Sequence, residues 1–165
     1  MRHALTGRLG LIEQIGRGGA GTVWCAWDSR RRTFVAAKVL APRSRPEASP
    51  GLVHPHVVAP HAIASHGPAD EGDGPVLVME LVRGGTADQL LAEHGALPEE
   101  YVAVLLEQLL EALVAVHAAG LVHQDVKPAN LLLEPTGRGR PHLRLGDFGT
   151  AVALDAPVAA LGAVA

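Results

Sequence analysis

The stretch HQDVKPANLLL, residues 123–133, places a His, an Asp, a Lys and an Asn just before three leucines. Asp125 can accept or orient a hydroxyl proton, Lys127 can neutralise a phosphoryl group, and Asn130 offers an amide oxygen to a hard cation such as Mg²⁺. Seventeen positions after Asn130, the triplet DFG supplies a carboxylate, Asp147, as a second oxygen ligand. That interval is long enough for a β-hairpin, so we expect Asn130 and Asp147 to lie at one site.

The composition limits the class of protein. The chain has 165 residues, of which 48% are hydrophobic and 19% are charged, and its net charge is −3. These values are typical of a globular protein. The sequence shows no cluster of basic residues of the kind that binds nucleic acid. Cys25 is the single cysteine, which excludes an intramolecular disulfide. The N-terminus lacks the apolar core of a signal peptide, and no apolar run approaches the ~20 residues that span a bilayer. We therefore expect a soluble, cytoplasmic protein without a membrane span.

Strand patterns come first along the chain. Runs enriched in β-branched, aromatic and other apolar residues predict five strands, at 9–16, 21–28, 33–40, 56–64 and 75–82. Between the third and fourth of them, Pro42, Pro46 and Pro50 fall at every fourth position. A proline inside a helix removes a hydrogen bond and clashes with the preceding turn, so no long helix is expected there.

Helix patterns follow the strands. Thr86 and Gln89 have the spacing of a capping box, and Gly95 can end the short helix that they begin. A long helix is expected at 98–119, with one continuous apolar face formed by Val102, Leu105, Leu106, Leu109, Leu110, Leu113, Val116 and His117. Strands first and helices second favour an α+β fold in two lobes. We place the lobes at 9–83 and 84–153, followed by an apolar tail at 154–165.

A glycine-rich segment, GRGGAGTV, lies between the first two expected strands. Its residues Gly16, Gly18, Gly21 and Val23 fit the pattern G-x-G-x-x-G-x-V, in which glycines let the backbone approach phosphate oxygens. Strands on both sides argue against the dinucleotide-binding version of the pattern, which needs a helix directly after it. On its own the segment fits a simple hairpin turn equally well. Lys38, in VAAK, fits either a phosphate-binding lysine or an ordinary lysine at a strand end.

These four patterns occur together and in one order. The glycine-rich loop, the strand lysine, the 123–130 stretch and DFG resemble the eukaryotic-like protein kinases, and specifically the bacterial Ser/Thr kinases, from about Leu9 to Ala153. The resemblance implies a protein-kinase-like fold with an antiparallel N-terminal lobe and the first part of a mainly helical C-terminal lobe. It also implies ATP and Mg²⁺ as cofactors and phosphoryl transfer to Ser or Thr hydroxyls of a protein that the sequence does not identify.

The resemblance gives a role to each matching residue. Asp125 would be the catalytic base, and Lys127 would stabilise the transferred phosphoryl group. Asn130 and Asp147 would hold Mg²⁺. The residues that would bind ATP are Gly16, Gly18, Gly21, Val23, Ala36, Lys38, Met79, Glu80, Val82 and Leu132. Among these, Val23, Ala36 and Leu132 would enclose adenine, Met79 would stand behind it, and 78–85 would be the hinge.

The sequence departs from the family pattern in three places. Gln124 stands where most members have the Arg that contacts a phosphorylated activation loop, so we expect no switching of that kind. Only sixteen positions separate Lys38 from His54, too few beside three prolines for the helix that carries the lysine's Glu partner. Glu47 is the one carboxylate in that interval, either as this partner or as an exposed loop residue.

The third departure follows DFG, where no activation segment or further helix is recognisable. We therefore expect a truncated catalytic domain whose long helix exposes part of its apolar face. Two hypotheses stay open. The chain is a Ser/Thr protein kinase with impaired turnover, or it is a catalytically inactive fragment that binds nucleotide or another protein.

Overall fold

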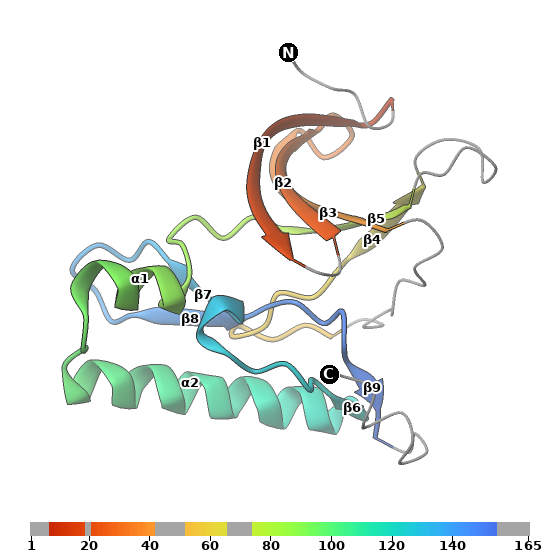
Figure 1. Cartoon of the computed structure of the whole chain (residues 1–165). Helices are drawn as coiled ribbons and strands as arrows, with labels where there is room; N and C mark the ends of the chain where they lie inside the picture. Colours follow the sequence, from red (N-terminus) through yellow and green to blue (C-terminus); the bar gives the residue numbers. More distant parts are fainter. Residues whose placement is uncertain (1–6, 19–20, 42–51, 66–73, 155–165) are drawn as a thin grey trace. The chain divides into compact units, whose positions relative to one another are not determined.

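The computed structural model describes residues 7–18, 21–41, 52–65 and 74–154. The chain divides into two units, the first made of residues 1–50 and 60–81 and the second of residues 51–59 and 82–165. The first unit is built on an antiparallel sheet and the second contains the helices (Figure 1). This is the α+β arrangement expected of a protein-kinase-like fold.

The sheet of the first unit has five strands in the order β1-β2-β3-β5-β4. They are β1 (Leu9–Gly18), β2 (Gly21–Asp28), β3 (Thr33–Leu40), β4 (Ala62–Ser65) and β5 (Pro75–Glu80). The first three agree with the expected strands because β-branched and aromatic residues dominate them. One face of the sheet is the core of the unit, formed by Leu9, Leu11, Ala26, Val35, Ala37, Val76 and Val78.

A buried carboxylate fixes the turn between β2 and β3. Asp28 has no exposed surface, and both its oxygens accept hydrogen bonds from Nε of Arg8 at 3.0 Å. Its Oδ1 also accepts from the backbone N–H groups of Arg30 and Arg31, at 3.0 and 3.1 Å. The hydrogen bond from Arg8 is the main reason that the pKa of Asp28 falls to about 2, and the two backbone bonds add to it. One aspartate therefore joins the start of β1 to the β2–β3 turn.

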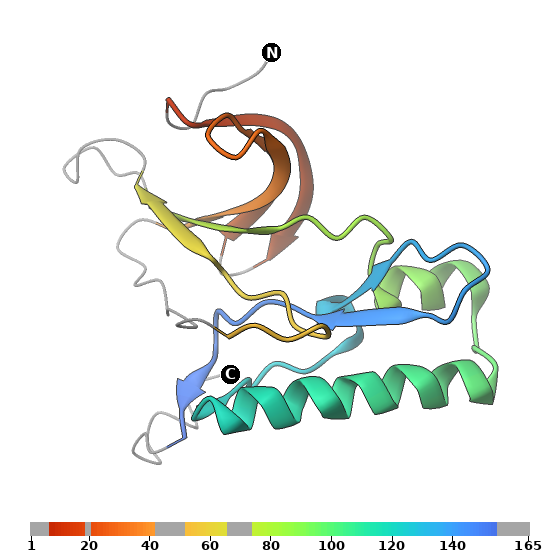
Figure 2. The same ribbon diagram turned by 180° about the vertical axis from the view of Figure 1, so that it is seen from behind.

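Within its described residues, the second unit contains two helices, a 3₁₀ turn and four short strands. Its elements are α1 (Ala87–His94), α2 (Glu99–Ala118), β6 (Leu121–Val122), the 3₁₀ turn η1 (Pro128–Asn130), β7 (Leu131–Glu134), β8 (His142–Leu145) and β9 (Val152–Ala153). The antiparallel hairpin β7–β8 runs alongside α2, as both views show (Figures 1 and 2). The expected capping box of α1 is present, with Thr86 and Gln89 exchanging side-chain to backbone bonds and Gly95 ending the helix.

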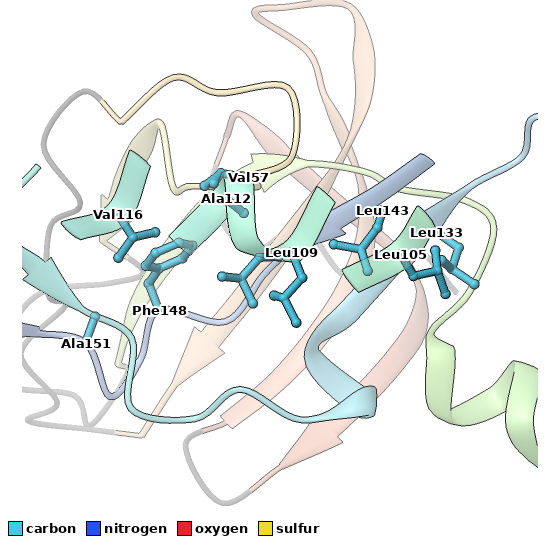
Figure 3. Packing of buried hydrophobic residues seen from close by; sticks show 10 residues of the cluster. Val57, Leu105, Leu109, Ala112, Val116, Leu133, Leu143, Phe148 and Ala151 are labelled. Carbon is cyan, nitrogen blue, oxygen red and sulfur yellow. The ribbon is translucent and has the colours of Figure 1, made fainter. Parts of the chain in front are cut away.

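The core of the second unit lies between α2 and the β7–β8 hairpin. Its members are Val57, Leu105, Leu109, Ala112, Val116, Leu133, Leu143, Leu145, Phe148 and Ala151 (Figure 3). The four residues from α2 recur at steps of four, three and four, which is the period of one helix face. Burying a side chain of this size contributes about 1.5–3 kcal/mol, so this face attaches α2 firmly to β8.

Part of the apolar face of α2 is exposed, in agreement with the expectation for this helix. Leu106 is 52% exposed and Leu110 is 62% exposed, although both were assigned to that face. The polar Gln108 is buried in their place, because its Nε2 donates to Pro141 O at 2.8 Å and its Oε1 accepts from Leu143 N at 2.7 Å. Both bonds reach the backbone at the start of β8. Gln108 therefore belongs to the buried face of α2, whereas Leu106 and Leu110 do not.

The hydropathy of α2 bears on the expected absence of a membrane span. The helix has 20 residues, an 18-residue window of it has a mean hydropathy of 1.6, and among the described residues it is the one helix long and apolar enough to cross a membrane. Glu107 and Glu111 interrupt it, so it is not an uninterrupted apolar run. Length and composition alone are weak evidence for a span, and one face of α2 is buried in the core as in a core helix.

Residues 51–59 belong to the second unit, whereas we had placed them in the first lobe. Val57 is buried in the core and forms a parallel bridge with Leu145. Two backbone bonds continue the contact, from Val58 N to Leu145 O at 2.8 Å and from Leu145 N to His56 O at 2.9 Å. Glu47 lies outside the described residues, so its pairing with Lys38 stays a prediction.

Candidate active site

The loop between β6 and β7 is organised around His123, a residue that the sequence analysis passed over. The ring is 1% exposed, and its Nε2 lies 2.9 Å from Gly146 O. A carbonyl can only accept, so Nε2 carries the proton and Nδ1 accepts from Asp125 N at 3.3 Å. Phe148 meets the ring edge-on, with centroids 4.8 Å apart. Burial lowers the pKa of His123, so the ring is neutral. Through its bonds to Asp125 N and Gly146 O, the ring connects the loop at 123–130 to the residue before Asp147.

Asp125, Lys127 and Asn130 meet as the sequence predicts. Lys127 Nζ lies 2.7 Å from Asp125 Oδ2. Asn130 Nδ2 donates to the same Oδ2 at 2.9 Å and to Asp125 O at 2.7 Å. Both amide hydrogens are thus used, which turns the oxygen Oδ1 of Asn130 away from Asp125. Asn130 is 7% exposed, so this orientation is held by its surroundings.

The charges in this cluster stabilise each other. The hydrogen bond from Lys127 is the main reason that the pKa of Asp125 is lowered, and Asn130 lowers it further against the opposing effect of burial. In turn Asp125 raises the pKa of Lys127. Asp125 is therefore ionised near neutral pH, able to orient a hydroxyl and to take its proton once the oxygen has begun to react.

The backbone brings Asp147 next to Asn130. Gly146 N donates to Asn130 O at 2.9 Å, in register with the β7–β8 hairpin. Asp147 is exposed, has a φ of 58°, and its Oδ1 accepts from Gly149 N at 3.2 Å. Gln124, with a φ of 65°, is in the same left-handed region. Non-glycine residues in that region are uncommon and collect at functional sites.

The residues after DFG pair with the beginning of the loop between β6 and β7. Thr150 Oγ1 donates to His123 O at 3.1 Å, and Ala151 N donates to Phe148 O at 3.1 Å. The pairing of β6 with β9 places Val152 opposite Val122. Thr150 was not foreseen as part of the site, because a single threonine after DFG has no distinctive spacing.

In the first unit, the register of the sheet gathers the expected nucleotide-binding residues. Gly16 lies opposite Val23, Val23 opposite Lys38, and Ala36 opposite Met79. Residues directly opposite in antiparallel strands project from the same face, which here is the face away from the core. Lys38 is 5% exposed, so it is not the ordinary surface lysine that its sequence position also allowed.

The glycines of the loop between β1 and β2 have separate roles. Gly18 pairs with Gly21 at the end of the hairpin. Gly21 has a φ of 145°, and a Cβ built there would lie 2.1 Å from Val39 O. Packing against β3 alone therefore requires glycine at position 21, whatever the loop binds.

The remaining expected residues divide between the units. Glu80 ends β5 in the first unit. Val82 and Leu132 belong to the second unit, where Leu132 lies in β7 opposite Arg144. The proposed contacts of these two residues with nucleotide stay predictions.

Comparison with known proteins gives one consistent result. A model of the protein kinase domain matches residues 9–162. The serine/threonine-protein kinase PknA of Mycobacterium tuberculosis is 40% identical over 173 aligned residues, covering 97% of this chain and 39% of PknA. The serine/threonine-protein kinase ppk31 of Schizosaccharomyces pombe is 32% identical over 148 residues, covering 84% of this chain and 14% of that protein. PknL of M. tuberculosis is 47% identical over 79 residues, covering 48% of this chain and 19% of PknL. The chain therefore spans well under half of the length of these relatives.

Proposed function

Because the chain belongs to the protein kinase family, we propose that it acts in the cytoplasm as the catalytic part of a serine/threonine protein kinase. The reaction is transfer of the terminal phosphoryl group of ATP to a Ser or Thr hydroxyl of a protein substrate. The observation that carries this proposal is the bonded cluster of Asp125, Lys127 and Asn130, tied through Gly146 to Asp147.

The donor set fits Mg²⁺. Both amide hydrogens of Asn130 bond to Asp125, so its Oδ1 is the atom that can coordinate a metal ion. Asp147 adds a carboxylate on the residue next to Gly146, whose N–H is bonded to Asn130 O. Mg²⁺ prefers such oxygen ligands together with phosphate oxygens. When bound, the ion would neutralise charge on the phosphates.

The cluster residues have distinct tasks in this proposal. Asp125 orients the substrate hydroxyl and accepts its proton as the new P–O bond forms. Lys127, paired with Asp125 in the structure, balances the charge that builds up on the phosphoryl oxygens. His123 is a positioning residue, because it holds Asp125 and Gly146 from opposite sides of one ring.

The remaining roles in this proposal concern nucleotide binding. Lys38 would pair with the inner phosphates, and the backbone at Gly16, Gly18 and Gly21 would cover them. Val23, Ala36 and Leu132 would enclose adenine, with Met79 behind it and the backbone at Glu80 and Val82 at the hinge. The shared sheet face of Val23, Ala36, Lys38 and Met79 supports this assignment.

A second candidate function is a catalytically inactive protein that binds nucleotide or another protein. It is favoured by the sequence after Lys38, where three prolines argue against a long helix like that of the family pattern. In the comparison with PknA, the 173 aligned residues exceed the 165 of this chain. PknA therefore has residues within the aligned region that this chain lacks.

Two measurements separate these functions. Thermal unfolding with and without Mg-ATP reports binding, because a ligand that binds only the folded state stabilises it by about 2.7 kcal/mol at a concentration 100 times its Kd. We expect a magnesium-dependent rise that is lost in Asp147→Asn and kept in Glu93→Gln, which removes an exposed carboxylate on α1. Phosphoryl transfer to Ser- and Thr-containing peptides then tests turnover.

The outcomes are distinct. Transfer that disappears in Asp125→Asn supports the kinase. Binding without transfer above the level of Asp125→Asn supports the inactive nucleotide-binding protein. A wild-type chain that unfolds cooperatively but shows no magnesium-dependent shift contradicts the proposed nucleotide site.

A further inference from the structure

Two aromatic side chains are exposed on the hairpin β2–β3. Trp27 and Phe34 lie directly opposite each other in the strand register, and their rings meet edge-on with centroids 5.1 Å apart. They are 39% and 41% exposed. On the other side of Trp27 the register partner is Gly10, which has no side chain to cover the indole. The contact between the rings stabilises the hairpin, and the pair also leaves apolar ring surface exposed at the hairpin end.

Three consecutive arginines follow this pair at the hairpin turn. Arg30, Arg31 and Arg32 are exposed, and none of the ion pairs within the described residues involves them. The neighbouring carboxylate, Asp28, is buried and already bonded to Arg8. The turn therefore presents three positive charges beside two aromatic rings.

Arg32 has a backbone conformation that does not suit arginine. Its φ is 54°, in the left-handed region, while its N–H donates to Asp28 O at 2.7 Å. Glycine or asparagine adopts this conformation at lower cost. An arginine at this position is explained if its charge is used, since the fold would be served better by glycine.

From these observations we propose that the β2–β3 hairpin end, defined by Trp27, Arg30, Arg31, Arg32 and Phe34, docks on an anionic lipid surface. Tryptophan and phenylalanine beside basic residues suit the interface of a membrane, where rings enter the headgroup region and arginines meet lipid phosphates. The proposal is independent of phosphoryl transfer.

The topology favours a lipid surface over a peptide. β2 pairs with β1 and β3 along its length, and β3 pairs with β5 from Val35 to Val39, so the hairpin offers no free edge long enough for a peptide strand to add. A hairpin end needs no groove to rest on a planar surface. Nucleic acid would call for a broader basic surface than one turn in a chain of net charge −3.

Binding of the full 165-residue chain to vesicles tests the proposal. One set of vesicles is pure phosphatidylcholine, and the other is an equimolar mixture of phosphatidylcholine and phosphatidylglycerol. We expect sedimentation with the anionic vesicles only, weakened by salt. Each arginine near the surface contributes about fivefold in affinity, so Arg30→Gln/Arg31→Gln should bind about 25-fold more weakly. Trp27→Phe should lose the blue shift of indole fluorescence on binding.

Arg32→Gly provides the sharpest comparison. It should raise the midpoint of thermal unfolding, because glycine accepts the left-handed φ, while weakening vesicle binding about fivefold. Loss of binding therefore cannot come from loss of folding. The matched control is Arg138→Gln, which removes an exposed arginine from the turn between β7 and β8 and should change binding less than twofold.

Several results would overturn the proposal. These are equal binding to neutral and anionic vesicles, no binding to either, or an effect of Arg138→Gln as large as that of Arg32→Gly. Capture by polyglutamate or by an oligonucleotide, with no binding to anionic vesicles, would identify a macromolecular partner instead. Displacement by excess inorganic phosphate at constant ionic strength would identify a site for a free anion.

Discussion

Replacing Asn130 by Asp should destabilise the protein strongly although the two side chains have the same shape. The amide Nδ2 of Asn130 donates to Asp125 O at 2.7 Å and to Asp125 Oδ2 at 2.9 Å. An aspartate has no hydrogen to donate at neutral pH, so both bonds are lost. It also places a second carboxylate against that of Asp125.

The magnitude follows from these contacts. The bond to the backbone carbonyl is worth about 0.5–1.5 kcal/mol and the bond to the carboxylate about 1.5–3 kcal/mol, so their loss costs about 2–4.5 kcal/mol. Two charges 2.9 Å apart would repel by about 6 kcal/mol at an effective dielectric constant of 20. The pair will move apart or bind a proton to avoid most of that repulsion. We expect Asn130→Asp to lower the free energy of unfolding by at least about 2 kcal/mol near neutral pH.

Urea unfolding followed by circular dichroism measures this change, and its pH dependence identifies the cause. Repulsion from Asp125 raises the pKa of the new carboxyl group in the folded state above its value in the unfolded chain. The penalty is therefore largest above the folded pKa and shrinks as pH falls toward about 4. The double variant Asp125→Asn/Asn130→Asp exchanges donor and acceptor, and should recover at least half of the loss.

The reasoning would be refuted by a loss below about 0.5 kcal/mol, the usual effect of a surface substitution. A loss that stayed constant between neutral pH and pH of about 4.5 would also refute it, because the repulsion must titrate.

Two further predictions test the fold around the site. Asp28→Asn should cost about 2 kcal/mol near neutral pH, since the pKa of Asp28 is lowered from 3.8 to about 2. A lowered folded pKa gives stability that is present above pH of about 4 and lost as pH falls toward 2, so acid unfolding of the variant should lose this step, as monitored by far-ultraviolet circular dichroism. Gln108→Leu should cost about 2–4 kcal/mol because Pro141 O and Leu143 N lose their buried partner. Leu110→Gln, on the exposed side of α2, should stay within about 0.5 kcal/mol, and equal losses in the two variants by urea unfolding would contradict the assignment of faces.

The parts of the site that lie close together in sequence could be predicted well. Asp125, Lys127 and Asn130 fall within six positions, so any tight loop brings them together, and their chemistry indicates the task. Thr86 and Gln89 form the expected capping box because that motif depends on local backbone alone. The strands at 21–28 and 33–40 were placed to the residue, since a polar turn separates two apolar runs.

Features that depend on contacts between distant segments were missed. Nothing within one turn of Gln108 shows that two backbone groups more than thirty positions away will satisfy its amide. His123 was overlooked because its partner, Gly146 O, is a backbone atom without any sequence signal. Exposure of part of the apolar face of α2 was expected, but that Leu106 and Leu110 would be the exposed residues was not, because a leucine-rich helix shows no clear boundary between its buried and exposed faces.

The assignment of residues 51–59 to the second unit has a consequence for how the protein can be divided. The chain passes from the first unit to the second, returns at residue 60, and leaves again at residue 82. A fragment beginning at residue 82 would contain both helices and the whole catalytic loop but would lack Val57, a member of its own core. During synthesis, Val57 leaves the ribosome before α2 and β8 do, so it can be buried only after both of these elements have been made. The second unit is therefore not a module that begins at residue 82, and an experiment that seeks the catalytic half alone must add 51–59 back as a separate peptide or a fused segment.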